Sequence, residues 1–200
     1  MLIIGTCARC GSGQDALARE ISLKLNLSVY SMGDIVRSIA KKKNYICSRE
    51  NLQNIRKHCD EKYGRSYFSE ILSKEILSKN ESAIITGIRT LEEVDTFNKY
   101  FNKTFYLVFV YADELIRFNR LLKRNEEKDP KNYSEFNIQM ENEKRLFDID
   151  ELELLSDHKI DCNMTLGEMK SEIDSIIQGF YFLHVKNNQH LLSGHEGILL

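Results

Sequence analysis

Residues 2–17 read LIIGTCARCGSGQDAL, in which an apolar run, a loop of small residues and a helix-forming segment follow one another. The backbone N–H groups of such a loop can converge on an anion, and the N-terminus of the helix behind it adds a favourable dipole. Glycines suit the loop because a side chain would block the close approach of an anion and because some positions need a positive φ. The stretch predicts a phosphate-binding loop between a buried first strand and a helix. A plain glycine-rich turn is the alternative.

The usual phosphate-loop pattern is Gly, four residues, Gly, Lys and then Ser or Thr. The aligned residues here are Ala8, Gly13, Gln14 and Asp15. Gln14 can donate a hydrogen bond but carries no charge, and losing a charge that stabilises the transition state can cost ~3–4 kcal/mol. Asp15 can ligate Mg²⁺ itself. Polyphosphate binding can survive these changes because the backbone amides remain.

Cys7 and Cys10 form a C-x-x-C within the same stretch. A redox pair is physically possible because a helix N-terminus lowers the pKa of a thiol. A metal site would need two further ligands at suitable spacing, which the sequence does not offer. The plainer interpretation is a buried strand thiol next to a small loop residue.

Composition narrows the classes of function. The 28 basic and 30 acidic residues give a formal net charge of −2, so the basic excess of nucleic-acid-binding proteins is missing. No run reaches the ~18 apolar residues that span a bilayer, and we expect no membrane partner. The five cysteines are odd in number and scattered, and no basic segment of an export signal precedes the first apolar run. We therefore expect reduced thiols in a cytoplasmic protein.

Short apolar runs alternate with helical patterns along the chain, which predicts an α/β fold with a five-stranded parallel sheet. The expected strands are Leu2–Cys7, Leu27–Tyr30, Ala83–Thr86, Thr104–Tyr111 and His158–Cys162. The stretch from Asp34 to Lys79 is too long for one crossover and predicts two or three helices inserted between strands. Asp129-Pro130 predicts a helix start, with Asp as the N-cap and Pro as the first helical residue. Thr165 and Glu168 suggest a capping box for a helix that extends to Phe182.

Several short segments, in this order and spacing, resemble the P-loop nucleoside monophosphate kinase group. The most similar members are the adenylate-kinase-related and dephospho-CoA-kinase-like nucleotide kinases. The segments are SMGDIVR (31–37), RENL (49–52), ITGIRTLEEV (85–94), RFNR (117–120) and Asp129-Pro130. The resemblance covers about residues 1–174.

The resemblance implies a three-layer P-loop NTPase-type sandwich with a five-stranded parallel sheet, a helical NMP-binding insertion and a lid. It implies one kinase-like domain over residues 1–180, with the insertion at about 32–79 and the lid at about 124–146. Residues 181–200 form a C-terminal extension. The extension is apolar for a free tail, so a homodimer contact or docking of a partner is a further expectation.

The resemblance also implies roles for individual residues. The donor site, for ATP with Mg²⁺, would comprise Arg9, Cys10, Gly11, Ser12, Gly13, Gln14 and Asp15, with Asp15 as the metal ligand and Asn163 near the donor base. The site for a nucleotide-like acceptor would comprise Gly33, Asp34, Arg37, Gly87 and Arg89. Arginine suits this task because its planar fork pairs with two phosphate oxygens. Solvated helix or loop charges are the alternative for these arginines, and a simple helix cap is the alternative for Asn163.

Three arginines at spacings of three and four share one helix face ahead of the expected lid: Arg117, Arg120 and Arg124. Lid arginines of such kinases clamp the transferring phosphoryl group and exclude water. These three are therefore the predicted catalytic residues, and Arg145 is a fourth candidate. A salt-bridged surface helix is the alternative, because several glutamates lie nearby in the sequence.

The chain departs from the resembled family at a second position besides Gln14. Family members usually carry Asp-Gly-Ile-Arg after the third strand, where this chain has Thr86-Gly-Ile-Arg89, so an acidic anchor for Mg²⁺ is missing. The predicted function is ATP-dependent phosphoryl transfer to a nucleoside monophosphate or dephospho-CoA-like acceptor. A catalytically degraded nucleotide-binding protein that acts as a sensor or interaction module is the alternative, and a purely interacting protein is a third possibility.

Overall fold

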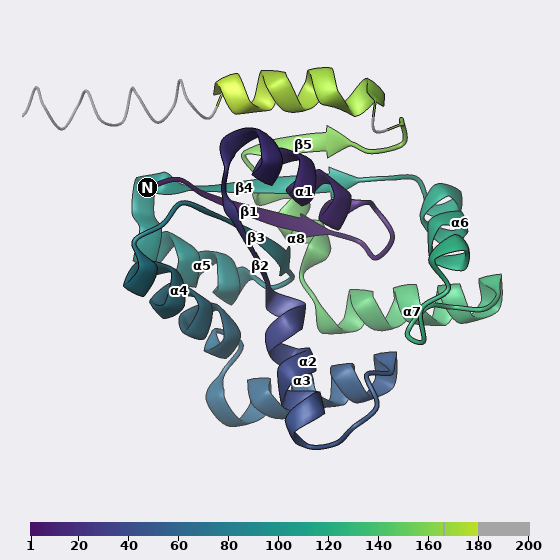
Figure 1. Ribbon diagram of the computed structural model, residues 1–200. Helices are drawn as coiled ribbons and strands as arrows, with labels where there is room; N and C mark the ends of the chain where they lie inside the picture. The colour runs from purple at the N-terminus through teal and green to yellow at the C-terminus, as the bar shows by residue number, and fades with distance from the viewer. Residues whose placement is uncertain (166, 180–200) are drawn as a thin grey trace, which may run out of the picture.

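A computed structural model describes residues 1–165 and 167–179 (Figure 1). Its sheet has five parallel strands in the order β2-β3-β1-β4-β5. The strands are β1 (Ile3–Ala8), β2 (Ser28–Ser31), β3 (Ala83–Ile88), β4 (Phe105–Tyr111) and β5 (His158–Asp161). Each begins and ends within two residues of its predicted position. The α/β fold with five parallel strands is therefore confirmed.

Helices cover both faces of the sheet. The helices are α1 (Gln14–Leu25), α2 (Met32–Lys42), α3 (Arg49–Tyr63), α4 (Tyr67–Lys79), α5 (Leu91–Phe101), α6 (Glu114–Arg124), α7 (Tyr133–Leu146), α8 (Ile149–Leu155) and residues 167–179, with a 3₁₀ turn at Asn102–Thr104. One core packs α1 and the helix at 167–179 against the sheet. The other packs α2, α3, α4, α5 and α8 against the opposite face. Because both faces of the sheet are buried, the sequences of the central strands are almost continuously apolar.

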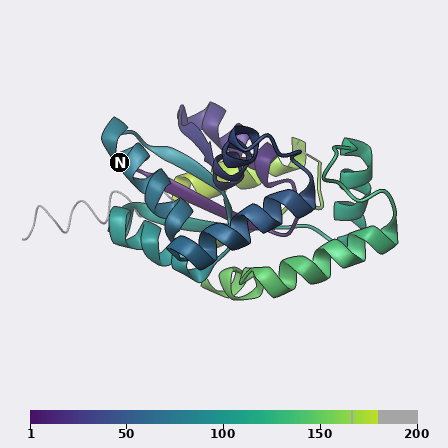
Figure 2. The same cartoon turned by 90° about the horizontal axis from the view of Figure 1, so that it is seen from below.

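The segment between β2 and β3 folds into three helices, α2, α3 and α4. Seen from below, α3 runs beside α7 although the two are far apart in the sequence (Figure 2). Arg49 Nη1 of α3 lies 4.0 Å from Glu143 Oε1 of α7. These two helices therefore bring the segment after β2 and the segment after α6 to the same side of the molecule.

The helix start predicted at Asp129-Pro130 is wrong. Helix α7 begins at Tyr133, and its N-cap Asn132 accepts a hydrogen bond from the backbone N–H of Glu135. Asp129 is buried and pairs with Arg124 instead of capping a helix. The ion pair of the buried Asp129 carboxylate with Arg124 of the preceding helix thus outweighs the local start signal.

At the other end of the chain, the Glu168 N–H donates to Thr165 Oγ1 and the Thr165 N–H donates to Glu168 Oε2, which is the predicted capping box. The predicted end of that helix at Phe182 and the extension at 181–200 lie outside the described residues. Within residues 1–165 and 167–179, no helix combines the length and the apolar character that crossing a membrane requires.

Candidate functional site

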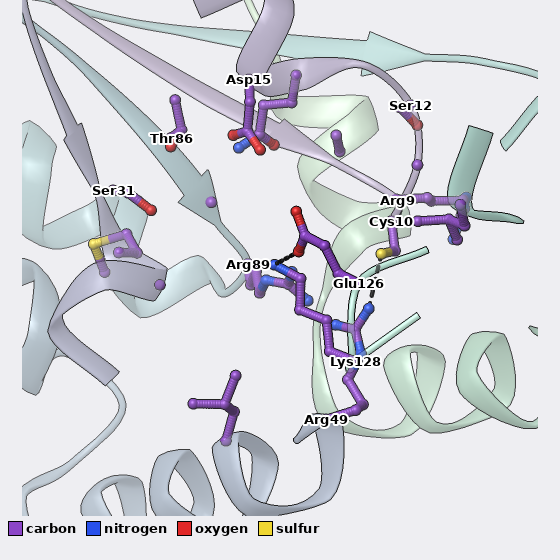
Figure 3. A pocket seen from close by; sticks show the side chains of 18 of the residues that line it. Arg9, Cys10, Ser12, Asp15, Ser31, Arg49, Thr86, Arg89, Glu126 and Lys128 are labelled. Atoms are coloured by element: carbon purple, nitrogen blue, oxygen red, sulfur yellow. Dashed lines mark hydrogen bonds and ion pairs between the residues drawn. The ribbon is translucent and has the colours of Figure 1, made fainter. Parts of the chain in front are cut away.

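A cavity of about 460 Å³ lies at the carboxyl ends of β1 and β3 (Figure 3). Ligands of parallel α/β sheets usually bind at this edge. The walls are the loop between β1 and α1, the first turns of α2 and α3, the segment after β3 and the segment after α6. Of the described side chains that line it, eight are arginine or lysine and two, Asp15 and Glu126, are acidic. The cavity therefore suits an anion.

The glycine-rich loop, residues 9–13, forms one end of the cavity. Gly11 and Gly13 have φ values of +86° and +97°, which favour glycine. A Cβ on Gly11 would lie 2.8 Å from the backbone oxygen of Arg117, so the loop packs directly on α6. Helix α1 begins at Gln14, and the first N–H groups of a helix have no partner within it. Within the loop, the N–H of Cys10 donates to Glu143 and that of Ser12 to the Arg9 carbonyl, so the backbone donors for an anion come from the glycines and from the first turn of α1.

Four further arginines of the cavity form what we call the arginine wall: Arg37 on α2, Arg49 and Arg56 on α3, and Arg89 after β3. Arg49 and Arg56 are seven residues apart and so lie on the same face of α3. Gly87, with φ of +84°, sits where the pairing of β1 with β3 shifts register, just ahead of Arg89. The wall is therefore assembled from three separate segments of the chain.

A buried carboxylate, Glu143 of α7, joins the arginine wall to the glycine-rich loop. Its Oε1 accepts a hydrogen bond from Arg89 Nη1 at 3.1 Å, and its Oε2 accepts one from the backbone N–H of Cys10 at 3.2 Å. Arg49 Nη2 lies 2.9 Å from Cys10 Sγ. Glu143 is only 5% exposed, so these groups hold one another in place away from water.

Glu93 anchors the other end of the wall and is fully buried. It accepts hydrogen bonds from Arg56 Nη2 at 2.6 Å and from the backbone N–H groups of Arg89 and Thr90. Burial raises the pKa of the Glu93 carboxyl, against the opposing effect of the Arg56 guanidinium. Because Glu93 also closes the capping box of α5, one side chain fixes both a helix start and two members of the wall.

The three predicted clamp arginines differ in position. Arg120 and Arg124 line the cavity, whereas Arg117 does not. Arg117 donates to the carbonyl oxygens of Cys10 and Ala112 and lies 5.5 Å from the ring centre of Phe136. Burial lowers its pKa. The guanidinium of Arg117 therefore supports the glycine-rich loop from behind, and this placement does not fit a clamp on a phosphoryl group.

Arg120 and Arg124 are also engaged. Arg120 donates to the carbonyl oxygens of Ser12 at 3.1 Å and Cys162 at 2.6 Å. Arg124 donates two hydrogen bonds to the Asp129 carboxylate. Burial acts to raise the pKa of Asp129, but the Arg124 guanidinium and the Glu126 N–H outweigh it and hold the pKa below its ordinary value.

Most residues predicted for the donor and acceptor sites come together at the cavity. Those that line it are Arg9, Cys10, Gly11, Ser12, Gly13, Gln14, Asp15, Gly33, Arg37, Gly87 and Arg89. Asp34, Asn163 and Arg145 do not line it. Asp34 pairs with Arg37 at 2.6 Å, and Asn163 Oδ1 accepts a hydrogen bond from the backbone N–H of Asp113. Asn163 therefore holds the backbone at the start of α6, and it is Thr165 with Glu168 that caps the helix at 167–179.

The cysteines of the C-x-x-C are both free and differ in surroundings. Burial raises the pKa of the Cys7 thiol to about 12, so Cys7 is a poor nucleophile. Among residues 1–165 and 167–179, no group of three metal-binding side chains occurs. These observations favour the plain interpretation, a buried strand thiol and a loop residue.

Sequence reasoning missed Arg49, Arg56, Lys128 and Glu143. Arg49 stands in the segment RENL (49–52), which carried part of the resemblance but no assigned role, and the spacing of seven between Arg49 and Arg56 was a second signal for a shared basic face. Glu143 and Lys128 reach the site only through the packing of α7 and the loop before it. No local pattern could have identified them.

The oxygen ligands available at the loop suit Mg²⁺, which prefers one or two carboxylates together with phosphate oxygens and water. Asp15 offers an exposed carboxylate in the first turn of α1, at the cavity. The Thr86 hydroxyl lies at the end of β3 and also lines the cavity. A single protein carboxylate is consistent with a cation held mainly by a phosphate ligand.

Comparisons with known proteins agree with this geometry. A family model described as an AAA domain matches residues 10–137. The UPF0200 protein of Methanocaldococcus jannaschii is 32% identical over 89% of this chain and 90% of its own length. Among solved structures, the fold is similar to a shikimate kinase from Aquifex aeolicus (18% identity, TM-score 0.53, 89% of this chain and 97% of that one). It is also similar to a gluconokinase from Sinorhizobium meliloti (15% identity, TM-score 0.58, 90% and 96%).

Proposed function

The chain belongs to the family described as an AAA domain, alongside the UPF0200 proteins, and its fold is P-loop kinase-like; from this premise we propose that it is a nucleotide kinase. The reaction is transfer of the ATP γ-phosphoryl group to a phosphorylated acceptor, a nucleoside monophosphate or a dephospho-CoA-like molecule. One observation carries the proposal. A glycine-rich loop and an arginine wall line the same cavity, which offers backbone donors and guanidinium groups for more than one anionic group.

In this proposal the donor phosphates bind the backbone N–H groups of the glycine-rich loop and of the first turn of α1. Asp15 holds Mg²⁺, which neutralises charge on the phosphates when bound. Arg120 lies against Ser12 at the loop, where its charge stabilises the transferring group. Catalysis then rests on positioning and electrostatics rather than on a covalent intermediate.

The acceptor end is the arginine wall. Arg37 and Arg89 come from different segments and meet at the cavity, where they can share one phosphate. Apolar side chains of Met32, Val36 and Leu52 line the same end and suit the non-phosphate part of an acceptor. A phosphorylated acceptor fits this wall better than a neutral one, because the partly exposed guanidinium groups of Arg37 and Arg89 line the cavity and can bond phosphate oxygens beside their carboxylate partners.

A phosphoryl-transfer screen tests the proposal. The donors are ATP and GTP with Mg²⁺, and the acceptors are nucleoside monophosphates, dephospho-CoA and shikimate. We expect turnover with a phosphorylated acceptor. Calorimetric titration accompanies the screen, and a protein that binds neither ATP–Mg²⁺ nor ADP nor any monophosphate at millimolar concentration would contradict the proposal.

A second candidate function is nucleotide binding without turnover, favoured by Gln14 and Thr86. The double variant Gln14→Lys with Thr86→Asp restores the usual pattern of the resembled kinases. A gain in rate of about a hundredfold, or ~3 kcal/mol of barrier, would favour the degraded enzyme. Brisk turnover by the natural protein that Gln14→Ala leaves unchanged would exclude it.

A further inference from the structure

Lys128, in the loop between α6 and α7, brings an ammonium group into the cavity. Its side chain lines the cavity, and its Nζ lies 2.9 Å from Glu126 Oε2. In Figure 3 the Lys128 side chain ends beside Arg89, and the Glu126 carboxylate that it contacts lies on the side toward Asp15. This lysine therefore enters from the face opposite the start of α1, where a phosphate loop usually carries its own lysine and this chain carries Gln14.

The loop that carries Lys128 is held in place by its own contacts. The buried Asp129 carboxylate accepts two hydrogen bonds from Arg124 and one from the backbone N–H of Glu126. The Lys128 carbonyl accepts a hydrogen bond from Gln139 of α7 at 3.3 Å. These contacts fix the backbone on both sides of Lys128, so the direction in which its side chain leaves the backbone is fixed as well.

The partner of Lys128 can be exchanged at low cost. The side chains of Lys128 and Glu126 are 25% and 49% exposed, and partly exposed ion pairs contribute only ~0–1 kcal/mol. Phosphate oxygens of a polyphosphate carry more charge than one carboxylate. An ammonium at this position would therefore leave Glu126 for a polyphosphate in the cavity.

We infer that Lys128 supplies, from the segment after α6, the positive charge that the glycine-rich loop lost at Gln14. The inference rests on the proposed function, since it assumes that a polyphosphate occupies the loop. Lys128 is then a polyphosphate-binding residue, and Glu126 is the side chain that holds its ammonium when no polyphosphate is bound. Lys128 thus takes the role of the lysine that the usual phosphate-loop pattern has at the position of Gln14.

The experiment is calorimetric titration of the full-length protein with Mg²⁺–ATP and with Mg²⁺–tripolyphosphate. Four variants are compared with the natural protein: Lys128→Ala, Lys123→Ala, Gln14→Lys, and Lys128→Ala combined with Gln14→Lys. Lys123 is an exposed lysine near the end of the neighbouring helix and does not line the cavity, so it is the matched control. Circular dichroism confirms that each variant is folded.

We expect Lys128→Ala to weaken both ligands by about tenfold or more, as the loss of a charged hydrogen bond implies, and Lys123→Ala to change them by less than about twofold. Gln14→Lys should restore most of the lost affinity in the Lys128→Ala background. Binding by the natural protein that Lys128→Ala does not weaken would overturn the inference alone. A double variant that stays as weak as Lys128→Ala would overturn it too, because the two positions would then not serve the same phosphates. No binding by the natural protein would overturn the proposed function, and the inference with it.

Discussion

The glycine-rich loop and the arginine wall line the same cavity but are built differently. The loop consists of backbone, with two glycines at positive φ and an uncharged Gln14 behind them. The wall consists of long side chains from three segments, fixed by the buried carboxylates of Glu93 and Glu143. A backbone site keeps its shape when side chains change, whereas a side-chain site depends on each partner. This difference explains how the loop can lose its lysine and still present donors to an anion.

The dependence of the wall on its carboxylates gives the largest expected effect. Glu93→Gln keeps the size of the side chain, but three hydrogen bonds lose their charged acceptor, and Arg56 keeps Asp60 as its remaining acidic partner. We expect it to reduce the free energy of unfolding by about 3–4 kcal/mol. The measurement is urea denaturation followed by circular dichroism. The adjacent Glu92→Gln is the control, because Glu92 is half-exposed and pairs with Arg65 at 3.3 Å, and it should cost less than about 1 kcal/mol. Equal costs for the two variants would show that Arg56 is held by other contacts.

The loop should instead be sensitive to its backbone. Gly11→Ala places a Cβ 2.8 Å from the Arg117 carbonyl oxygen at a φ of +86°, and we expect a loss of about 2–3 kcal/mol from strain and overpacking. Gly64→Ala separates the two causes, because Gly64 has a φ of +89° and nothing lies within 4 Å of its added Cβ. Because its ψ of 158° puts Gly64 in a region that is nearly restricted to glycine, the control should cost about 1–3 kcal/mol from backbone strain alone. Urea denaturation gives both values, and a titration with Mg²⁺–ATP should detect loss of binding in Gly11→Ala only.

The loop between α6 and α7 closes the cavity between the two regions, and its shape depends on Asp129. We expect Asp129→Asn to reduce the free energy of unfolding at pH 7 by about 2 kcal/mol, because two hydrogen bonds from Arg124 lose their charged acceptor. The pKa of Asp129 is lower in the folded protein than in the unfolded chain. Its stabilising contribution is therefore present above about pH 4, the unfolded pKa, and is lost as the pH falls further.

Denaturation curves between pH 7 and pH 3 test this prediction. The difference between the natural protein and Asp129→Asn should be constant down to about pH 4 and should shrink below it. Asp113→Asn is a control at the start of the helix that carries Arg124, since the Asp113 side chain caps no N–H of α6 and accepts a hydrogen bond from the Tyr111 hydroxyl rather than from a guanidinium. A difference that does not shrink in acid would mean that the Asp129 carboxylate is not the stabilising group.

The sequence predicted the strands and the loop better than the wall. Strands such as Ile3–Ala8 are buried on both faces, so their apolar runs are visible without any knowledge of the fold. The loop is contiguous, and Gly11 and Gly13 mark its positive φ positions. The wall needs contacts across long stretches of chain, such as Arg89 with Glu143, and no periodicity in either segment reveals them.

The three predicted lid arginines also show that a sequence pattern does not reveal tertiary contacts. The spacing of Arg117, Arg120 and Arg124 correctly placed them on one helix. Spacing does not show which part of the protein that helix face packs against. Arg117 packs under the glycine-rich loop, and Arg124 is paired with Asp129. Likewise, Asp129-Pro130 carries a strong local start signal, and a partner five residues earlier in the chain overrides it.

The smallest effect on stability should come from the part of the wall that lacks a buried partner. Arg37 pairs with the exposed Asp34, so Arg37→Gln should change the free energy of unfolding by less than about 0.5 kcal/mol. If Arg37 binds the acceptor phosphate, the same variant should weaken acceptor binding by about tenfold, and Mg²⁺–ATP binding should stay unchanged. Calorimetric titration with each ligand separately measures both. Lys41→Gln, an exposed change on the same helix, should alter neither. Equal weakening of donor and acceptor by Arg37→Gln would mean that loop and wall hold a single ligand, and the division of the cavity into two anion sites would then be wrong.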